Sequence, residues 1–370
     1  MAGIYIHVPF CKSKCTYCDF ASYPEKLARA ESYFACLYRE IKGRGLQLKD
    51  KVFDTVYIGG GTPSVVDESL IVGTMRAIRQ AFTITPDAEI TIEMNPGTVT
   101  EQKIKAYKSV GINRFSIGLQ TGYNAQLERL NRIHTAKDYL LCTNLIKGEN
   151  ISADILIGLH DQTAEQVEKS IELAVAGGAK HVSVYALTPE VGTPIYTDYL
   201  NGELPSDDET ASLYEVAKNY LATKGFSRYE VSNFSLDGYQ SKHNLNYWRR
   251  GEYIGLGVSA SSFIDGRRFT NTYNVEEYIN AVIVNRFPEI SSEVIDGADA
   301  KFEFIMLGLR TAEGISVAKY DQTFNADFKT EYAVPLKKHA ERLEFNGDRL
   351  RIKDEFLYVQ NGIITDFILD

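Results

Sequence analysis

The stretch HVPFCKSKCTYCDF, residues 7–20, holds three of the five cysteines of the chain. Cys11, Cys15 and Cys18 follow the spacing C-x3-C-x2-C, directly after the strand-like run GIYIHV at 3–8. A structural zinc ion normally takes four protein ligands from two separated pairs, and the sequence has no second C-x2-C pair. A [4Fe–4S] cluster takes cysteine thiolates, and three of them leave one iron open to a small molecule. The stretch therefore predicts an iron–sulfur site on a loop after the first strand, with zinc or coincidence as alternatives.

The composition is that of a globular protein without a nucleic-acid function. The 370 residues are 44% hydrophobic and 24% charged, with a net charge of −9. An acidic chain without a dense block of Lys and Arg is a poor match for nucleic acid. We expect neither a membrane span nor a signal peptide, and therefore a cytoplasmic protein with reduced cysteines. The two isolated cysteines, Cys36 and Cys142, are expected to be small buried hydrophobic residues.

The residues around the cysteine loop alternate between short apolar runs and amphipathic stretches, which predicts an α/β fold with a parallel sheet. Local pattern alone leaves an open doubly wound sheet and a barrel as alternatives. Glycines and polar residues gather where the predicted strands end, which favours a full or partial (β/α) barrel over residues 1–230. Asp154 is the exception, since it is expected to open its strand. The predicted strands are 3–8, 54–60, 89–94, 114–120, 153–159 and 181–187, and the predicted helices are 27–42, 67–82, 100–109 and 163–176.

The organisation changes after the sixth predicted strand. A helix is expected near 299–310, and LEFNGDRLRI at 343–352 has the pattern of a hairpin with Asn346–Gly347 at its turn. A helix followed by a hairpin suggests a small α+β module. We therefore expect a barrel domain at 1–235, a connecting segment at 236–290 and a small winged-helix-like C-terminal domain at 291–370.

The cysteine spacing, with an aromatic residue before the last cysteine, resembles that of the radical S-adenosylmethionine (SAM) enzymes. Five further motifs occur in the order and spacing of the oxygen-independent coproporphyrinogen III oxidase group. They are GGGTP at 59–63, TIEMNPG at 91–97, RFSIGLQT at 114–121, LNRIH at 130–134 and DILIGL at 154–159. The resemblance covers nearly the whole chain and implies a radical SAM barrel.

The resemblance also implies roles for individual residues. Cys11, Cys15 and Cys18 would ligate a [4Fe–4S] cluster, and SAM would chelate its fourth iron. Glycines near the methionine part of SAM would let backbone amides approach closely. Ordinary structural roles are the alternative for each residue: turn glycines, a capping Glu or a surface Arg. The residues implied in SAM binding are Tyr5, Tyr17, Gly60, Gly61, Thr62, Glu93, Gln120, Arg132, Asp154 and Ala186.

Three features resemble the haem-chaperone branch of this group more than its oxidases. Phe20 stands where the oxidases have an extra cysteine, and the first strand begins almost at the start of the sequence. The third feature is HNLNYW at 243–248, which matches the haem-associated H-N-x-x-Y-W motif of the branch. An imidazole is a common haem ligand, and aromatic rings offer flat apolar area for a macrocycle. The implied haem residues are His243, Asn244, Tyr247 and Trp248, and the alternative is that they cap backbone and fill core.

Three functions therefore compete. The first is a haem chaperone with a [4Fe–4S] cluster and SAM that delivers haem to respiratory proteins. The second is an oxidase that decarboxylates coproporphyrinogen III, and the third is another radical SAM enzyme acting on a porphyrin. The expected partners are haem or a porphyrin, a haem-accepting respiratory protein and an electron donor. Peripheral membrane contact is compatible with this function, and a membrane span or nucleic acid is not expected.

Overall fold

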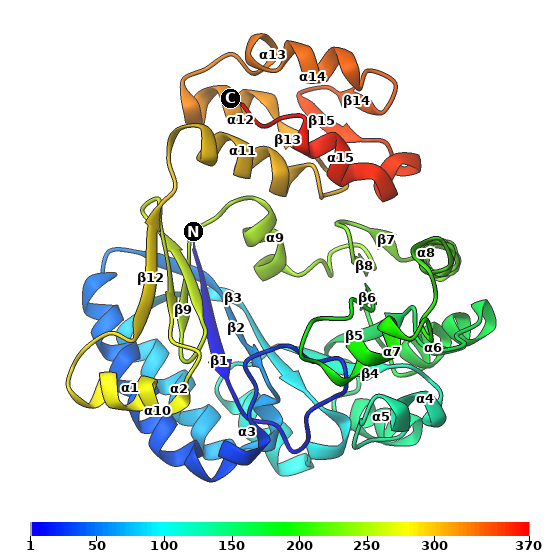
Figure 1. The fold of residues 1–370 in the computed structure, drawn as a ribbon. Helices are drawn as coiled ribbons and strands as arrows, with labels where there is room; N and C mark the ends of the chain where they lie inside the picture. The colour runs from blue at the N-terminus through cyan, green and yellow to red at the C-terminus, as the bar shows by residue number, and fades with distance from the viewer. Residues whose placement is uncertain (1, 370) are drawn as a thin grey trace.

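A twelve-stranded sheet forms the body of the molecule in a computed structural model that describes residues 2–369 (Figure 1). Its strand order is β12-β11-β10-β9-β1-β2-β3-β4-β5-β6-β8-β7, and β12 and β7 form two separate edges. The sheet curves but does not close, so the predicted (β/α) fold is confirmed in its partial-barrel form. Within residues 2–369, no helix combines the length and apolar character needed to cross a membrane.

The first six strands run parallel, as their near-continuous apolar runs predict. Burial on both faces makes such strands read as hydrophobic runs, and β1 is buried at every position except Tyr5. The strands are β1 (Ala2–Val8), β2 (Val52–Gly60), β3 (Thr83–Met94), β4 (Arg114–Gln120), β5 (Asn150–Ile157) and β6 (His181–Ala186). Because β5 begins at Asn150, Asp154 lies within the strand, and the expectation that it opens the strand is wrong.

Helices cover the outer face of the parallel sheet, and side chains cap several of their first turns. Thr163 and Gln166 form a reciprocal capping box at α6, as Ser206 and Glu209 do at α8. The outer helices are α1 (Ala30–Gln47), α2 (Glu68–Ala81), α3 (Glu101–Ser109), α4 (Asn124–Arg129), α5 (Ala136–Leu145), α6 (Ala164–Ala176) and α8 (Asp207–Thr223). Short 3-10 turns occur at Pro24–Arg29, Pro63–Val65 and Pro96–Thr98, and α7 spans Pro194–Leu200.

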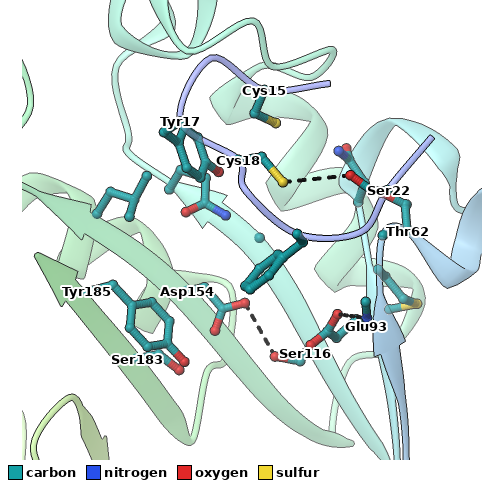
Figure 2. Close-up of a pocket in the computed structure, with 18 of the residues that line it drawn as sticks. Cys15, Tyr17, Cys18, Ser22, Thr62, Glu93, Ser116, Asp154, Ser183 and Tyr185 are labelled. Atoms are coloured by element: carbon teal, nitrogen blue, oxygen red, sulfur yellow. Dashed lines mark hydrogen bonds between the residues drawn. The ribbon is translucent and has the colours of Figure 1, made fainter. Parts of the chain in front are cut away.

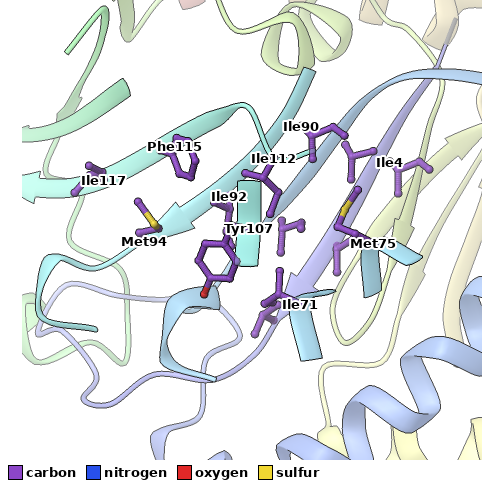
Figure 3. Close-up of a cluster of buried hydrophobic side chains, with 14 of the residues drawn as sticks. Ile4, Ile71, Met75, Ile90, Ile92, Met94, Tyr107, Ile112, Phe115 and Ile117 are labelled. Carbon is purple, nitrogen blue, oxygen red and sulfur yellow. The ribbon is translucent and has the colours of Figure 1, made fainter. Parts of the chain in front are cut away.

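The main hydrophobic core lies between the sheet and these helices (Figure 3). Ile4, Ile90 and Ile92 of the strands face Ile71 and Met75 of α2. All five side chains are almost completely buried. This core holds the strands rigidly, so the polar residues on their opposite face have fixed positions.

The segment at 236–290, expected to connect two domains and to carry the HNLNYW motif, contributes strands to the same sheet. β9 (Tyr253–Leu256) pairs parallel with β1, and β10 (Ser261–Ile264) and β11 (Arg267–Asn271) follow as antiparallel strands. β12 (Glu289–Val294) forms the outer edge beside β11. The remaining elements are β7 (Ser227–Arg228) and β8 (Asn233–Ser235) at the opposite edge, α9 (Lys242–Trp248) and α10 (Val275–Ile283).

The C-terminal unit has its own small core and lies above α9 in Figure 1. The predicted helix is α11 (Gly297–Gly308), and the predicted hairpin is formed by β14 (Leu343–Asn346) and β15 (Arg349–Ile352). β13 (Ile315–Ser316) completes a three-stranded sheet. The other helices are α12 (Val317–Phe324), α13 (Phe328–Glu331), α14 (Ala333–Lys338) and α15 (Gln360–Thr365), with a 3-10 turn at Asp354–Val359.

Candidate functional site

A cavity of about 380 Å³ lies between the cysteine loop and the carboxyl ends of the parallel strands (Figure 2). Figure 2 shows Glu93, Ser116 and Asp154 pointing into it from three strands, with Cys15 and Cys18 on the loop beyond them. The structure thus brings together the three cysteines and every predicted SAM residue except Tyr5. The predicted residues that line it are Cys11, Cys15, Tyr17, Cys18, Gly60, Gly61, Thr62, Glu93, Gln120, Arg132, Asp154 and Ala186.

The three thiols face different polar partners around this cavity. Cys11 Sγ lies 3.5 Å from the hydroxyl of Thr62, and Cys18 Sγ lies 3.8 Å from the hydroxyl of Ser22. Arg132 donates from Nη1 to Cys15 Sγ at 3.4 Å. Burial raises the pKa of the Cys11 and Cys18 thiols.

The spacing of the thiols fits a cluster better than a single ion. The three sulfur atoms of Cys11, Cys15 and Cys18 do not all lie within 4.8 Å of one another. Thiolates that share one zinc ion must approach more closely than that, because each Zn–S bond is only about 2.3 Å long. The all-sulfur donor set and its wider spacing suit the several irons of a cluster.

Glycines let the turn after β2 pack directly against the cysteine loop. Gly60 has a φ of +108°, and a Cβ there would lie 2.5 Å from the ring of His7. A Cβ on Gly61 would lie 2.6 Å from the carbonyl oxygen of Phe10. The backbone amide of Thr62 donates to that same carbonyl at 2.7 Å. The turn therefore needs glycine for both backbone conformation and space.

Two half-buried carboxylates, Glu93 and Asp154, face the cavity. Glu93 accepts hydrogen bonds from the hydroxyl of Tyr57 at 2.7 Å and from the amide of Gly60 at 3.1 Å. Burial raises the pKa of Glu93 to about 7 and that of Asp154 to about 6. Asp154 accepts from the hydroxyl of Ser116 at 3.5 Å. A cationic or hydroxyl-bearing ligand in the cavity would add a further partner to each carboxylate.

The opposite wall of the cavity is set by Arg132 and Gln120. Arg132 also donates from Nη2 to the carbonyl of Gly118 at 3.0 Å, so one guanidinium ties the cysteine loop to β4. Its buried Nε has no hydrogen-bond partner among the described residues. Gln120 ends β4 with a positive φ of 67°, an uncommon conformation for a residue with a Cβ.

Sequence reasoning missed several polar residues in the cavity wall. Ser116 and Ser183 line it from β4 and β6, beside Tyr57 and Tyr185. The signal was present in β4, where Arg114, Ser116, Gly118 and Gln120 alternate with apolar residues and all line the cavity. A period of two places such residues on one face of a strand.

The predicted haem residues are divided between two environments. The ring of His243 is buried; its Nδ1 lies 2.7 Å from Thr55 Oγ1, and its Nε2 lies 2.9 Å from Tyr247 Oη. Asn244 lines the first cavity. Tyr247 lines a second cavity of about 800 Å³, together with Tyr5. Trp248 is half-buried and lines neither of them.

Comparisons with known proteins agree with the fold and the cysteine loop. Residues 5–174 match the model of the radical SAM superfamily, and residues 295–355 match that of the HemN C-terminal domain. The solved structure of coproporphyrinogen III oxidase (HemN) from Escherichia coli superimposes with a TM-score of 0.86 at 19% identity. That alignment covers 99% of this chain and 90% of the oxidase, so the two share a fold.

Two curated relatives carry the name heme chaperone HemW. The relative from Lactococcus lactis is 33% identical over 373 residues, which cover 99% of this chain and 97% of the relative. The relative from Bacillus subtilis is 33% identical over 348 residues, which cover 92% of each chain. Similarity of this extent confirms the resemblance drawn from the motifs. The chain therefore belongs to the HemW family of the radical SAM superfamily.

Proposed function

We propose that this protein is a haem chaperone that holds a [4Fe–4S] cluster, SAM and haem, and delivers haem to respiratory proteins. The haem-chaperone part of the proposal extends to this chain what the name of its relatives says of them. It works in the cytoplasm, receives electrons from a separate donor and meets membrane-bound acceptors only peripherally. It does not oxidise coproporphyrinogen III.

The first cavity has the groups that this function needs. Cys11, Cys15 and Cys18 would hold the cluster, which supplies an open iron for SAM and an electron. Arg132 orients Cys15 through its 3.4 Å hydrogen bond. Glu93 offers a half-buried carboxylate to a cationic part of SAM.

The other SAM contacts come from the strand ends around Glu93. Asp154 would accept from ribose hydroxyls, and the amides of Gly60, Gly61 and Thr62 would lie beside the methionine part. Gln120 and Tyr17 line the same cavity, as does Ala186 at the end of β6. These contacts would position SAM without requiring its cleavage.

One observation carries the haem part of the proposal: the helix that bears HNLNYW borders both cavities. Asn244 of α9 lines the first cavity, and Tyr247 of the same helix lines the second. A ligand in one cavity would therefore contact the helix that bounds the other. This arrangement suits a carrier whose haem site responds to its SAM site.

The test begins with anaerobic reconstitution of the cluster in the full chain. Haemin is then titrated into the protein and followed by absorbance, with bound haem and iron measured after gel filtration. We expect one haem per chain with the cluster retained. The loaded protein should transfer haem to haem-depleted respiratory membranes faster than free haemin does at the same concentration.

A parallel incubation tests the oxidase. Coproporphyrinogen III, SAM and dithionite are added to the reconstituted protein, and the porphyrins are separated chromatographically after oxidation. We expect no protoporphyrin from this reaction. Conversion of coproporphyrinogen III would overturn the chaperone proposal, and so would a failure of the wild-type protein to retain haem.

A further inference from the structure

The second cavity is built from parts of the chain that lie far apart in sequence. Its walls come from the cysteine loop, from β9 to β11 and from α11 of the C-terminal unit. Its volume of about 800 Å³ is roughly twice that of the first cavity, at about 380 Å³. Lys14, Asp19 and Phe20 line both cavities, so the cysteine loop is their common wall.

Aromatic rings form one side of the second cavity. The rings of Tyr247 and Tyr253 meet edge to face, with their centroids 4.6 Å apart. The rings of Tyr253 and Phe263 lie 6.5 Å apart. The first pair of rings is nearly perpendicular and the second is tilted by 42°, so together they form an angled apolar wall against which the edge and part of one face of a large ligand can pack.

Two arginines face the same space. The guanidinium of Arg250 lies 4.7 Å from the ring centroid of Phe263, and that of Arg268 lies 5.4 Å from it. Both arginines line the cavity. A ligand that covers the aromatic surface would therefore have two guanidinium groups at its edge, and paired arginines match carboxylates in geometry and charge.

A single carboxylate of the C-terminal unit holds both arginines. Arg250 donates from Nε to Oε2 of Glu303 at 2.7 Å, and Arg268 donates from Nη2 to the other carboxylate oxygen. The Glu303 side chain is about nine-tenths buried, with 11% of its surface exposed. Arg268 also lies 4.0 Å from Glu293, which is largely exposed. Two positive groups thus share one buried negative group.

We propose that the second cavity binds the porphyrin, and that its two propionates displace Glu303 from Arg250 and Arg268. The macrocycle lies against Tyr247, Tyr253 and Phe263. This inference rests on the proposed haem function and assigns its binding site.

The exchange of carboxylates makes loading reversible. Each guanidinium exchanges one carboxylate for another, so neither arginine is left unpaired. Glu303, with 11% of its side chain exposed, gives up both partners, and this cost weakens porphyrin binding. The free energy gained when the propionates pair with the arginines is offset by the free energy lost when Glu303 leaves them. The free energy gained by burying the aromatic side chains under the macrocycle is not offset in this way. Because Glu303 belongs to α11, loading also releases a contact between the sheet and the C-terminal unit. A cargo held this way can leave when Glu303 returns to the arginines.

The test compares haemin affinity in variants of the reconstituted full chain. Arg250→Gln and Arg268→Gln should each weaken binding about tenfold, because each removes a charged hydrogen bond to a propionate. Glu303→Gln should tighten binding several-fold, because the competing carboxylate is gone. Arg249→Gln is the matched control, since Arg249 is exposed, pairs with Glu313 at 3.1 Å and does not line the cavity.

Haemin dimethyl ester separates carboxylate recognition from stacking. The ester should bind equally to the wild type, Arg250→Gln and Arg268→Gln. A higher haemin affinity in Glu303→Gln cannot result from misfolding. For Arg250→Gln and Arg268→Gln, which should lose affinity, the melting temperature shows whether the variant is still folded.

The outcomes distinguish this inference from the proposed function. Haem binding by the wild type, with all cavity variants behaving like Arg249→Gln, would overturn the assignment of the site. Absence of haem binding by the wild type would overturn the haem function itself.

Discussion

Nε2 of His243 lies 2.9 Å from the hydroxyl oxygen of Tyr247, and its Nδ1 lies 2.7 Å from Thr55 Oγ1. Both ring nitrogens therefore have protein partners, and the ring is buried with 1% of its surface exposed. Burial lowers the pKa of His243 to about 3, so the imidazole is neutral at physiological pH. We infer that His243 acts on the second cavity through Tyr247, as a positioning residue.

His243→Ala should lower the free energy of unfolding by about 2–4 kcal/mol. The substitution leaves a cavity and removes the partners of Thr55 and Tyr247. Haem affinity should fall with it, because Tyr247 loses its fixed orientation, while the iron content is unchanged. Urea unfolding, haemin titration and iron analysis measure the three effects. Lys242→Ala, at an exposed position of the same helix, should change stability by less than about 0.5 kcal/mol. An unaltered haem affinity in His243→Ala would contradict the positioning role.

Replacement of Cys11, Cys15 or Cys18 by Ala should abolish the cluster. Each substitution removes one of the three thiols that line the first cavity. The wild type should hold about four irons and four sulfides per chain after anaerobic reconstitution. Colorimetric iron and sulfide assays measure both. Cys142→Ala is the control: its thiol is buried away from this cavity, so that variant should keep its iron. Loss of iron in the control alone would refute the ligand assignment.

Gly60→Ala should destabilise the protein far more than Gly148→Ala. Both glycines have positive φ, +108° and +89°, so each substitution strains the backbone by about 1–3 kcal/mol. A Cβ on Gly60 also meets the His7 ring at 2.5 Å, whereas one on Gly148 meets nothing within 4 Å. Crowding should add about 1–3 kcal/mol at Gly60. Urea unfolding of the two variants measures the difference in their free energies of unfolding. Equal decreases would show that the His7 ring moves aside for the new Cβ.

The sequence predicted the parallel strands well because their burial makes them apolar along their whole length. The resemblance of the motifs implied the residues of the first cavity, and they come together because the carboxyl ends of parallel strands meet at one edge of the sheet. Asp154 was misplaced because β5 begins four residues earlier, at Asn150, in the polar-looking run NISAD. The added strands β9 and β10 are four residues long and pair with distant segments, so no local pattern marks them.

The second cavity was beyond local prediction for a related reason. Tyr253, Arg268 and Glu303 come from three elements, and only the packing of the C-terminal unit on α9 and the sheet brings them together. Tyr5, which the resemblance implies in SAM binding, lines the second cavity, and its hydroxyl lies 3.0 Å from Nδ1 of His7.

SAM affinity should rise with pH through about 7, and Glu93 should cause the rise. Burial raises the pKa of Glu93 to about 7 from an ordinary value of 4.5, so the carboxyl is largely protonated at pH 6 and largely charged at pH 8. Only the charged form attracts a cationic part of SAM. Below its pKa the affinity should therefore fall, approaching tenfold per pH unit.

Stability without SAM should depend on pH in the opposite direction. The unfolded chain releases the Glu93 proton near pH 4.5, while the folded chain keeps it to about pH 7. Between these values the folded state binds more protons, so Glu93 makes the fold less stable as the pH rises. Glu93→Gln removes both effects. Equilibrium dialysis of SAM between pH 6 and 8, and urea unfolding between about pH 5 and 7, should thus give flatter profiles for this variant than for the wild type. Identical slopes in the SAM profiles of the two proteins would exclude Glu93 as the titrating group.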